Sequence, residues 1–158
     1  NWVQFGNIEV RQVGADHHDR PMPFRPNAAN GHLIRAEGRA VYVVGDSDLT
    51  DEMSTMAELA SAPIDVVLVP IAGWGPKLSE GHLNPERAAI ACARVGARWA
   101  LPYHSGTLHP PVVNWLFGDW LDRPLREFTA ALRVHAPETQ LAPIAGQHGV
   151  PWRVPAAG

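Results

Sequence analysis

Residues 40–48 read AVYVVGDSD, an apolar run that stops abruptly at a glycine and a carboxylate. Residues 32–36 (HLIRA) and the pair Glu37-Gly38 precede this run, an arrangement typical of a β-hairpin with a tight turn. Apolar residues bounded by turn residues on both sides favour a strand. The stretch therefore predicts a hairpin whose second strand places Asp46 at its exit.

Strand-like and helix-like segments continue on both sides of the hairpin. Residues 8–13 alternate apolar and polar side chains, as in a half-buried strand. Nearly continuous apolar runs at 64–70 and 98–102 are typical of strands covered on both faces. The remaining expected elements are helices at 51–61, 84–95 and 122–135 and a last strand at 139–144. This alternation predicts one α/β domain over residues 1–158.

Composition and charge exclude several classes of protein. The chain has 46% hydrophobic and 18% charged residues, which is typical of soluble globular proteins, and its net charge of −3 with scattered Lys and Arg argues against nucleic acid. No apolar run approaches the roughly 20 residues that cross a bilayer, and no signal peptide opens the chain. We therefore expect no membrane span and a cytoplasmic location. The single cysteine, Cys92, is expected in the core.

Three polar side chains follow predicted strands at equivalent positions. His17, Asp46 and His104 each lie just past the end of an apolar run. Strand ends in α/β sheets form the crevice where ligands bind, because loops there carry polar groups without burying them. Imidazoles and a carboxylate are a ligand set suited to Zn²⁺ and similar divalent ions. One interpretation of the pattern is therefore a metal site.

The same residues also fit simpler roles. Asp46 can cap a helix that begins near Thr50, because Gly-Asp-Ser is common turn chemistry. His104 can be a hydrogen-bonded histidine at a strand end, and His17 and His18 can be loop residues in solvent. Spacing alone leaves these alternatives open.

Four linked motifs resemble the metallo-β-lactamase-fold hydrolases. Residues 31–48 (GHLIRAEGRAVYVVGDSD) are similar to the segment in which a strand delivers a metal-bridging aspartate, and residues 73–89 (GWGPKLSEGHLNPERAA) to the loop and helix that follow. Residues 101–107 (LPYHSGT) are similar to the family's P-I-H-W-G-T element, and residues 15–17 (ADH) to the element with its middle histidine. The subgroup most resembled includes L-ascorbate-6-phosphate lactonase and N-acyl-phosphatidylethanolamine phospholipase D.

This resemblance implies a fold, a site and a reaction. The fold is an αββα sandwich, of which this chain covers about one half, a mixed sheet with its covering helices. His17 and His104 match metal ligands, Asp46 matches a carboxylate that bridges two metals, and His82 matches a histidine that lies near the substrate or supports the ligands. His18 competes with His17 for its role. The implied cofactors are two divalent ions, Zn²⁺ or else Mn or Fe, which activate a hydroxide towards an ester, lactone, amide or phosphodiester. No catalytic residue is assigned.

One departure from the family pattern is large. The first family signature, His-x-His-x-Asp-His, is absent from this sequence, and so are the strands expected before it. The chain opens without an initiator Met and reads as the C-terminal portion of a longer fold. The expected partners are a small-molecule substrate and the missing N-terminal half, or another chain, covering the exposed sheet. The alternative function is a non-catalytic half-domain that acts as a structural or interaction module.

Overall fold

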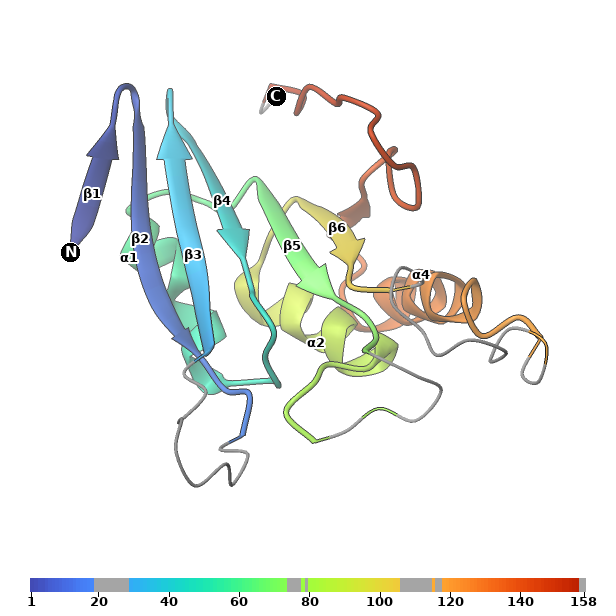
Figure 1. The fold of residues 1–158 in the computed structure, drawn as a ribbon. Helices are drawn as coiled ribbons and strands as arrows, with labels where there is room; N and C mark the ends of the chain where they lie inside the picture. The colour runs from blue at the N-terminus through green and yellow to red at the C-terminus, as the bar shows by residue number, and fades with distance from the viewer. Residues whose placement is uncertain (19–28, 74–77, 79, 106–114, 116–117, 157–158) are drawn as a thin grey trace.

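The computed structural model describes residues 1–18, 29–73, 78, 80–105, 115 and 118–156, and its ribbon is drawn in Figure 1. The described strands form a 7-stranded mixed sheet in which spatial order follows chain order. β1 to β4 are joined antiparallel, and β4 to β7 are joined parallel. The strands are β1 (Trp2–Phe5), β2 (Ile8–Ala15), β3 (Ala29–Ala36), β4 (Arg39–Val43), β5 (Val66–Pro70), β6 (Trp99–Tyr103) and β7 (Gln140–Leu141). The expected α/β class with a mixed sheet is confirmed.

The hairpin that joins β3 to β4 turns at the predicted pair. Glu37 has φ +52° and Gly38 has φ +73°, so both turn residues occupy the left-handed region. Two such residues match the twist of antiparallel strands, which is why this turn suits a two-residue hairpin. Ala36 pairs with Arg39 directly before and after the turn, and the register continues down both strands.

Helices cover one face of this sheet. In Figure 1, α1 (Met56–Ala60) and α2 (Pro85–Val95) lie behind the strands, and α4 (Arg123–His135) lies beside α2. The helix expected at 51–61 is a 3-10 turn, η1 (Asp51–Thr55), that runs into the short α1. α2 begins as the sequence predicts, because the Asn84 side chain accepts a hydrogen bond from the Arg87 amide.

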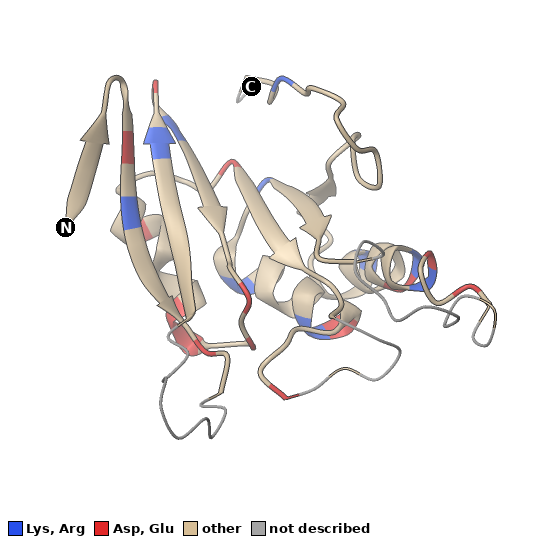
Figure 2. Cartoon of the chain, in the orientation of Figure 1, with Lys and Arg blue, Asp and Glu red and all other residues tan. Residues whose placement is uncertain are grey.

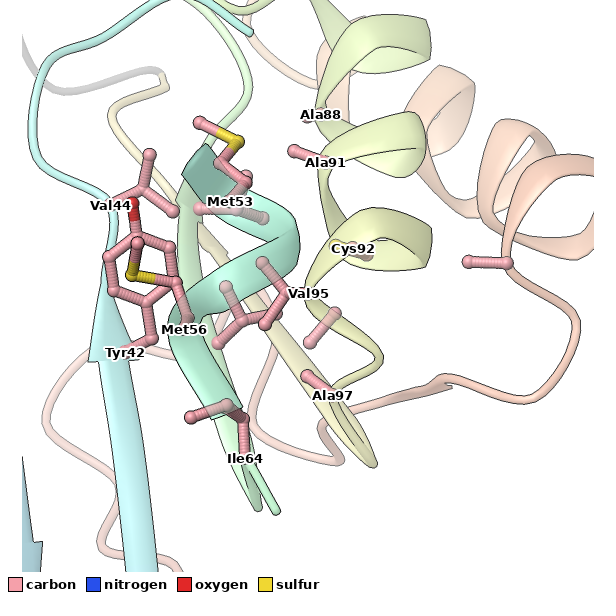
Figure 3. Close-up of a cluster of buried hydrophobic side chains, with 14 of the residues drawn as sticks. Tyr42, Val44, Met53, Met56, Ile64, Ala88, Ala91, Cys92, Val95 and Ala97 are labelled. Carbon is pink, nitrogen blue, oxygen red and sulfur yellow. The ribbon is translucent and has the colours of Figure 1, made fainter. Parts of the chain in front are cut away.

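The core lies between the sheet and these helices. Leu33, Tyr42 and Val67 are neighbours on adjacent strands, and each is at most 1% exposed. Burying a large apolar side chain of this kind contributes about 1.5–3 kcal/mol. Figure 3 shows the centre of the cluster, where side chains from β4, η1 and α1 meet those of α2; it labels Tyr42, Val44, Met53, Met56, Ile64, Ala88, Ala91, Cys92, Val95 and Ala97.

The opposite face of the sheet carries a row of apolar side chains. Val10, Ile34 and Val41 are cross-strand neighbours in the middle of this row. Towards the β1 edge the row becomes exposed, with Val3 53% and Phe5 62% accessible. Among the described elements, none crosses in front of β1 to β4 in Figure 1. We call this surface, formed by Val3, Phe5, Ile8, Val10, Ile34 and Val41, the open face.

One strand was not expected from the sequence, and another is shorter than predicted. β1 is a separate strand that pairs with β2 across a turn at Gly6, where the sequence shows strand-like residues without a clear boundary. The strand expected at 139–144 is reduced to Gln140–Leu141. Pro143 has no amide hydrogen to donate, so pairing stops before it.

Charged side chains are scattered over the described chain. Figure 2 shows Lys and Arg on strands and helices alike. None of the described helices is long and apolar enough to cross a lipid bilayer.

Cys92 reports on the integrity of the core. The residue is 0% exposed, and burial raises the pKa of its thiol to about 12. Because the thiolate is the reactive form, we expect the native chain to react with a disulfide reagent at least about 100-fold more slowly than the denatured chain. Stopped-flow labelling with and without denaturant measures both rates, and equal rates would show that the core is not formed.

Candidate metal centre

The candidate site lies where strands end at one edge of the sheet. β2 is antiparallel to β3, and β3 is antiparallel to β4, so β2 and β4 run in the same direction. β5 and β6 share that direction because they join β4 in parallel. The carboxyl ends of β2, β4 and β6 therefore meet at one edge, where they deliver His17, Asp46 and His104.

Asp46 lies between two imidazoles. Its Oδ2 atom is 3.2 Å from His17 Nε2, and its Oδ1 atom is 3.4 Å from His82 Nε2. The two imidazole rings make an edge contact, with centroids 4.8 Å apart. One ligand atom from each of these three residues lies within 4.8 Å of the others, close enough to hold one metal ion.

The Asp46 carboxylate fits an ion better than a structural role. The 3-10 turn η1 has Thr50 at its N-cap and no side-chain cap, so Asp46 does not cap it. The Asp46 side chain is 40% exposed as a whole, yet its Oδ1 atom is buried and accepts no hydrogen bond from the described residues. A buried carboxylate oxygen without a hydrogen bond costs free energy that a cation would offset.

Two histidines are held in the orientation that metal ligands adopt. His82 Nδ1 lies 3.2 Å from the Glu80 carbonyl oxygen, and His104 Nδ1 lies 2.8 Å from the Ala72 carbonyl oxygen. A carbonyl only accepts, so in both contacts Nδ1 carries the proton and Nε2 is the atom with the lone pair. Metal-binding histidines are commonly fixed in this way.

His104 lies beside the three-residue cluster rather than within it. Its ring stacks on that of His82 with centroids 6.3 Å apart. Its backbone has φ +63°, a left-handed conformation that is uncommon for a residue with a side chain. Strained backbone conformations of this kind cluster at active sites and ligand-binding sites.

Two glycines permit the close packing of the site. A Cβ atom on Gly45 would lie 2.3 Å from the Asn30 carbonyl oxygen, and one on Gly81 would lie 2.4 Å from the His17 carbonyl oxygen. Both glycines also have positive φ, near +80°. The contact at Gly81 brings the His82 loop directly against His17, which a larger residue would prevent.

His17 and His18 point to different carboxylates. His17 has a side chain only 14% exposed and faces Asp46. His18 is 54% exposed and lies 3.9 Å from Asp48. The geometry thus favours His17 over its neighbour as the residue that shares a site with Asp46.

Tyr103 braces the turn that carries Asp46. Its hydroxyl donates a 2.8 Å hydrogen bond to the Gly45 carbonyl oxygen. Burial, together with the nearby Asp46 carboxylate, raises the pKa of Tyr103 to about 12. The phenol therefore stays protonated, and remains a donor, throughout the physiological pH range.

The structure groups the candidate residues differently from the sequence. It brings His17 and Asp46 together with His82, and the spacing of residues in the sequence did not predict this contact between His82 and the Asp46 carboxylate. His104 lies further from the carboxylate, and its ring stacks on the His82 ring. The signal available in the sequence was Gly81, a glycine directly before a histidine that leads into a helix.

The protein has a mixed sheet with helices over one face, and the ends of its parallel strands gather imidazoles around one carboxylate. These features place it in the metallo-β-lactamase fold class. Residues 2–105 match the family described as the beta-lactamase superfamily domain, and the chain belongs to this family.

Curated relatives carry the name UPF0173 metal-dependent hydrolase. One from Geobacillus thermodenitrificans is 38% identical over 84 residues, covering 53% of this chain and 33% of the relative. Another, from Carboxydothermus hydrogenoformans, is 28% identical over 137 residues, covering 84% of this chain and 55% of the relative. This chain thus spans about half the length of such relatives, or less.

Solved structures show the same fold at low sequence identity. Igni18, described as a metallo hydrolase from Ignicoccus hospitalis, superposes with a TM-score of 0.62 at 20% identity, over 90% of this chain and 53% of that one. Yeast PDE1 superposes with a TM-score of 0.64 at 15% identity, over 89% of this chain and 45% of that one. Both likenesses bear on the fold alone.

The strained backbone of His104 predicts that glycine is more stable than alanine at this position, the reverse of the order expected in a strand. His104→Gly should be more stable than His104→Ala by about 1 kcal/mol, because glycine adopts positive φ without strain while both variants lose the bond to Ala72. At the exposed strand residue Gln12, glycine should instead be less stable than alanine by about 0.5–1 kcal/mol. Urea denaturation of the four variants measures this, and the same ranking at both positions would contradict the strain.

Proposed function

We propose that this chain carries part of the metal site of a metal-dependent hydrolase. The observation that carries the proposal is the Asp46 carboxylate, which has a buried oxygen that accepts no hydrogen bond from the described residues and an imidazole Nε2 on each side. Family membership supports the reaction class, since curated relatives bear that name. Zn²⁺ is the expected ion, with Mn²⁺ and Fe²⁺ as alternatives, because its preferred ligands are imidazole and carboxylate.

The chain by itself offers one ion three ligands. His17, Asp46 and His82 lie close enough to share it, and a catalytic zinc usually keeps three protein ligands and an open position. His82 thereby offsets the deficit left by the absent His-x-His-x-Asp-His motif. In a completed fold with two ions, we assign Asp46 to the position between them, His17 and His104 to one ion each, and His82 to the substrate side.

The bound ions would supply Lewis acidity, which lowers the pKa of water and stabilises negative charge on a carbonyl or phosphoryl oxygen. The residues of this chain hold and orient that chemistry. Asp46 offsets the positive charge, and the carbonyls of Glu80 and Ala72 keep His82 and His104 in the Nδ1-protonated tautomer. The substrate class is a small molecule with an ester, lactone, amide or phosphodiester bond.

The second half of the proposal concerns the open face. The row of Val10, Ile34 and Val41 extends towards the β1 edge to the exposed Val3 and Phe5. Together they form an exposed apolar patch, which is typical of an interaction surface. Its occupant in our proposal is a second sheet from the part of the fold that these 158 residues do not include, since the chain spans only about half the length of its curated relatives, or less. Sheets pack face to face through such apolar rows.

Metal titration of the 158-residue chain tests the site. We expect calorimetry to show one Zn²⁺ per chain, and we expect His17→Ala, Asp46→Asn and His82→Ala each to weaken binding by more than about 100-fold, since even supporting residues cost 10–100-fold. His104→Ala should cost less in the isolated chain.

His135→Ala is the matched control, because its ring faces Glu86 on α2 instead of Asp46. A wild-type chain that binds none of Zn²⁺, Mn²⁺ or Fe²⁺ at excess ion contradicts the proposed site. Equal losses for His104→Ala and His82→Ala would instead assign His104 to the same ion.

Complementation tests the partner. The N-terminal half of a metal-dependent hydrolase relative, added as a separate polypeptide, should co-purify with this chain and give hydrolysis of chromogenic ester or phosphodiester substrates. Ile34→Glu on the open face should abolish co-purification, because it would bury a charge between two sheets. Val134→Glu, at a helix position that is 74% exposed, is the control. Association that ignores Ile34→Glu would rule out the open face as the docking surface.

A further inference from the structure

Ser47 is an unusual residue in this structure because it is polar and completely buried. The described core contains two buried polar residues, Ser47 at 0% exposure and Thr139 at 7%. Ser47 follows Asp46 directly, at the exit of β4. A buried hydroxyl is stable only when its hydrogen bonds are satisfied, so its partners indicate what it is for.

The Ser47 side chain joins two segments of the candidate site. Its Oγ atom accepts a 2.9 Å hydrogen bond from the Asp16 amide and donates a 2.8 Å hydrogen bond to the Asp48 carbonyl oxygen. The Asp48 amide in turn donates to the Asp16 carbonyl oxygen. The hydroxyl therefore locks the exit of β4 onto the exit of β2, one residue away from both His17 and Asp46.

The Ser47 backbone joins the third segment. Its carbonyl oxygen accepts a 3.1 Å hydrogen bond from the amide of Leu83, which follows His82. Leu83 is itself 0% exposed, so this bond anchors the His82 loop from the inside. Ser47 is thus the chain neighbour of Asp46 and is hydrogen-bonded to the chain neighbours of His17 and His82, the other two members of the metal-ligand cluster.

We infer that Ser47 is a positioning residue that sets the spacing of His17, Asp46 and His82 through its hydroxyl. The inference rests on the proposed function, since it concerns the metal site. Serine and threonine alone supply, in so short a side chain, a donor and an acceptor at once. Alanine would leave the Asp16 amide and the Asp48 carbonyl without their partner, and the two strand exits would separate.

The test compares Ser47→Ala, Ser47→Thr and wild type in the full chain. Ser47→Ala should weaken Zn²⁺ binding by about 10–100-fold, the range found when residues that support metal ligands are removed. Ser47→Thr keeps the hydroxyl and should restore affinity to within a few-fold of wild type. Thermal denaturation of the metal-free proteins confirms that each variant is folded before titration.

A matched control separates positioning from simple loss of stability. Thr139 is also buried, and its hydroxyl donates a 2.8 Å hydrogen bond to the Ala97 carbonyl oxygen, away from the site residues. Thr139→Val should lower the melting temperature while leaving Zn²⁺ affinity unchanged. If Thr139→Val weakened Zn²⁺ binding as much as Ser47→Ala, the role of Ser47 would be merely structural and the inference would fall.

A metal-free readout keeps the inference separate from the proposed function. The rings of His17 and His82 are in contact, so NMR should show a cross-relaxation peak between them in wild type and its loss in Ser47→Ala. Hydrogen exchange of the Leu83 amide should also accelerate, although its acceptor is a backbone oxygen that the substitution leaves in place. If wild type binds no metal, the proposed function fails, and these two signals alone decide on Ser47. Unchanged signals and unchanged affinity in Ser47→Ala would overturn the inference.

Discussion

The parallel pairing of β4 with β5 is the constraint on which the rest of the structure depends. Asp65 fixes one end of the register, because its carboxylate accepts hydrogen bonds from the Ala40 amide at 3.0 Å and the Arg39 guanidinium at 2.6 Å. At the other end, the Val44 amide donates to the Leu68 carbonyl oxygen at 3.0 Å. A slip of one residue would turn every side chain of β4 to the opposite face. The core, the crossover through η1 and α1, and the strand exit that carries the site would all be lost with it.

The parts of the fold that the sequence predicts well are those decided by local chemistry. Glu37-Gly38 turns the hairpin where expected, and Asn84 and Gly96 bound α2 through a side-chain cap and a left-handed C-cap. The apolar runs predict buried strands because they are short and bounded by turn residues, whereas a buried helix is usually longer. Prediction is poorer for β7, where the expected strand at 139–144 is reduced to Gln140–Leu141 before Pro143.

The sequence predicts only part of the candidate site. Strand exits place His17 and Asp46 at one edge, and this follows from topology alone. His82 reaches the same carboxylate because its loop packs directly against the segment that carries His17. This close approach is possible because Gly81 has no Cβ atom. The hydrophobic periodicity of the sequence cannot predict such a contact between two loops. The role of Ser47 is likewise not visible in the sequence, where it belongs to an ordinary Gly-Asp-Ser turn; only its hydrogen bonds to two distant segments distinguish it.

The site carries local costs that the core must outweigh. His104 is held in a left-handed conformation that costs about 1–2 kcal/mol. The buried Asp46 oxygen, which accepts no hydrogen bond from the part of the chain that the structure describes, costs about 1–3 kcal/mol. An ion that binds only the folded chain adds about 2.7 kcal/mol of stability at a hundredfold excess over its Kd. The two magnitudes are comparable, so an ion bound to the folded chain would offset local costs of this size. Because these costs lie at the sheet edge, while Tyr42 and Val67 are buried in its middle, the site can remain strained in a stable fold.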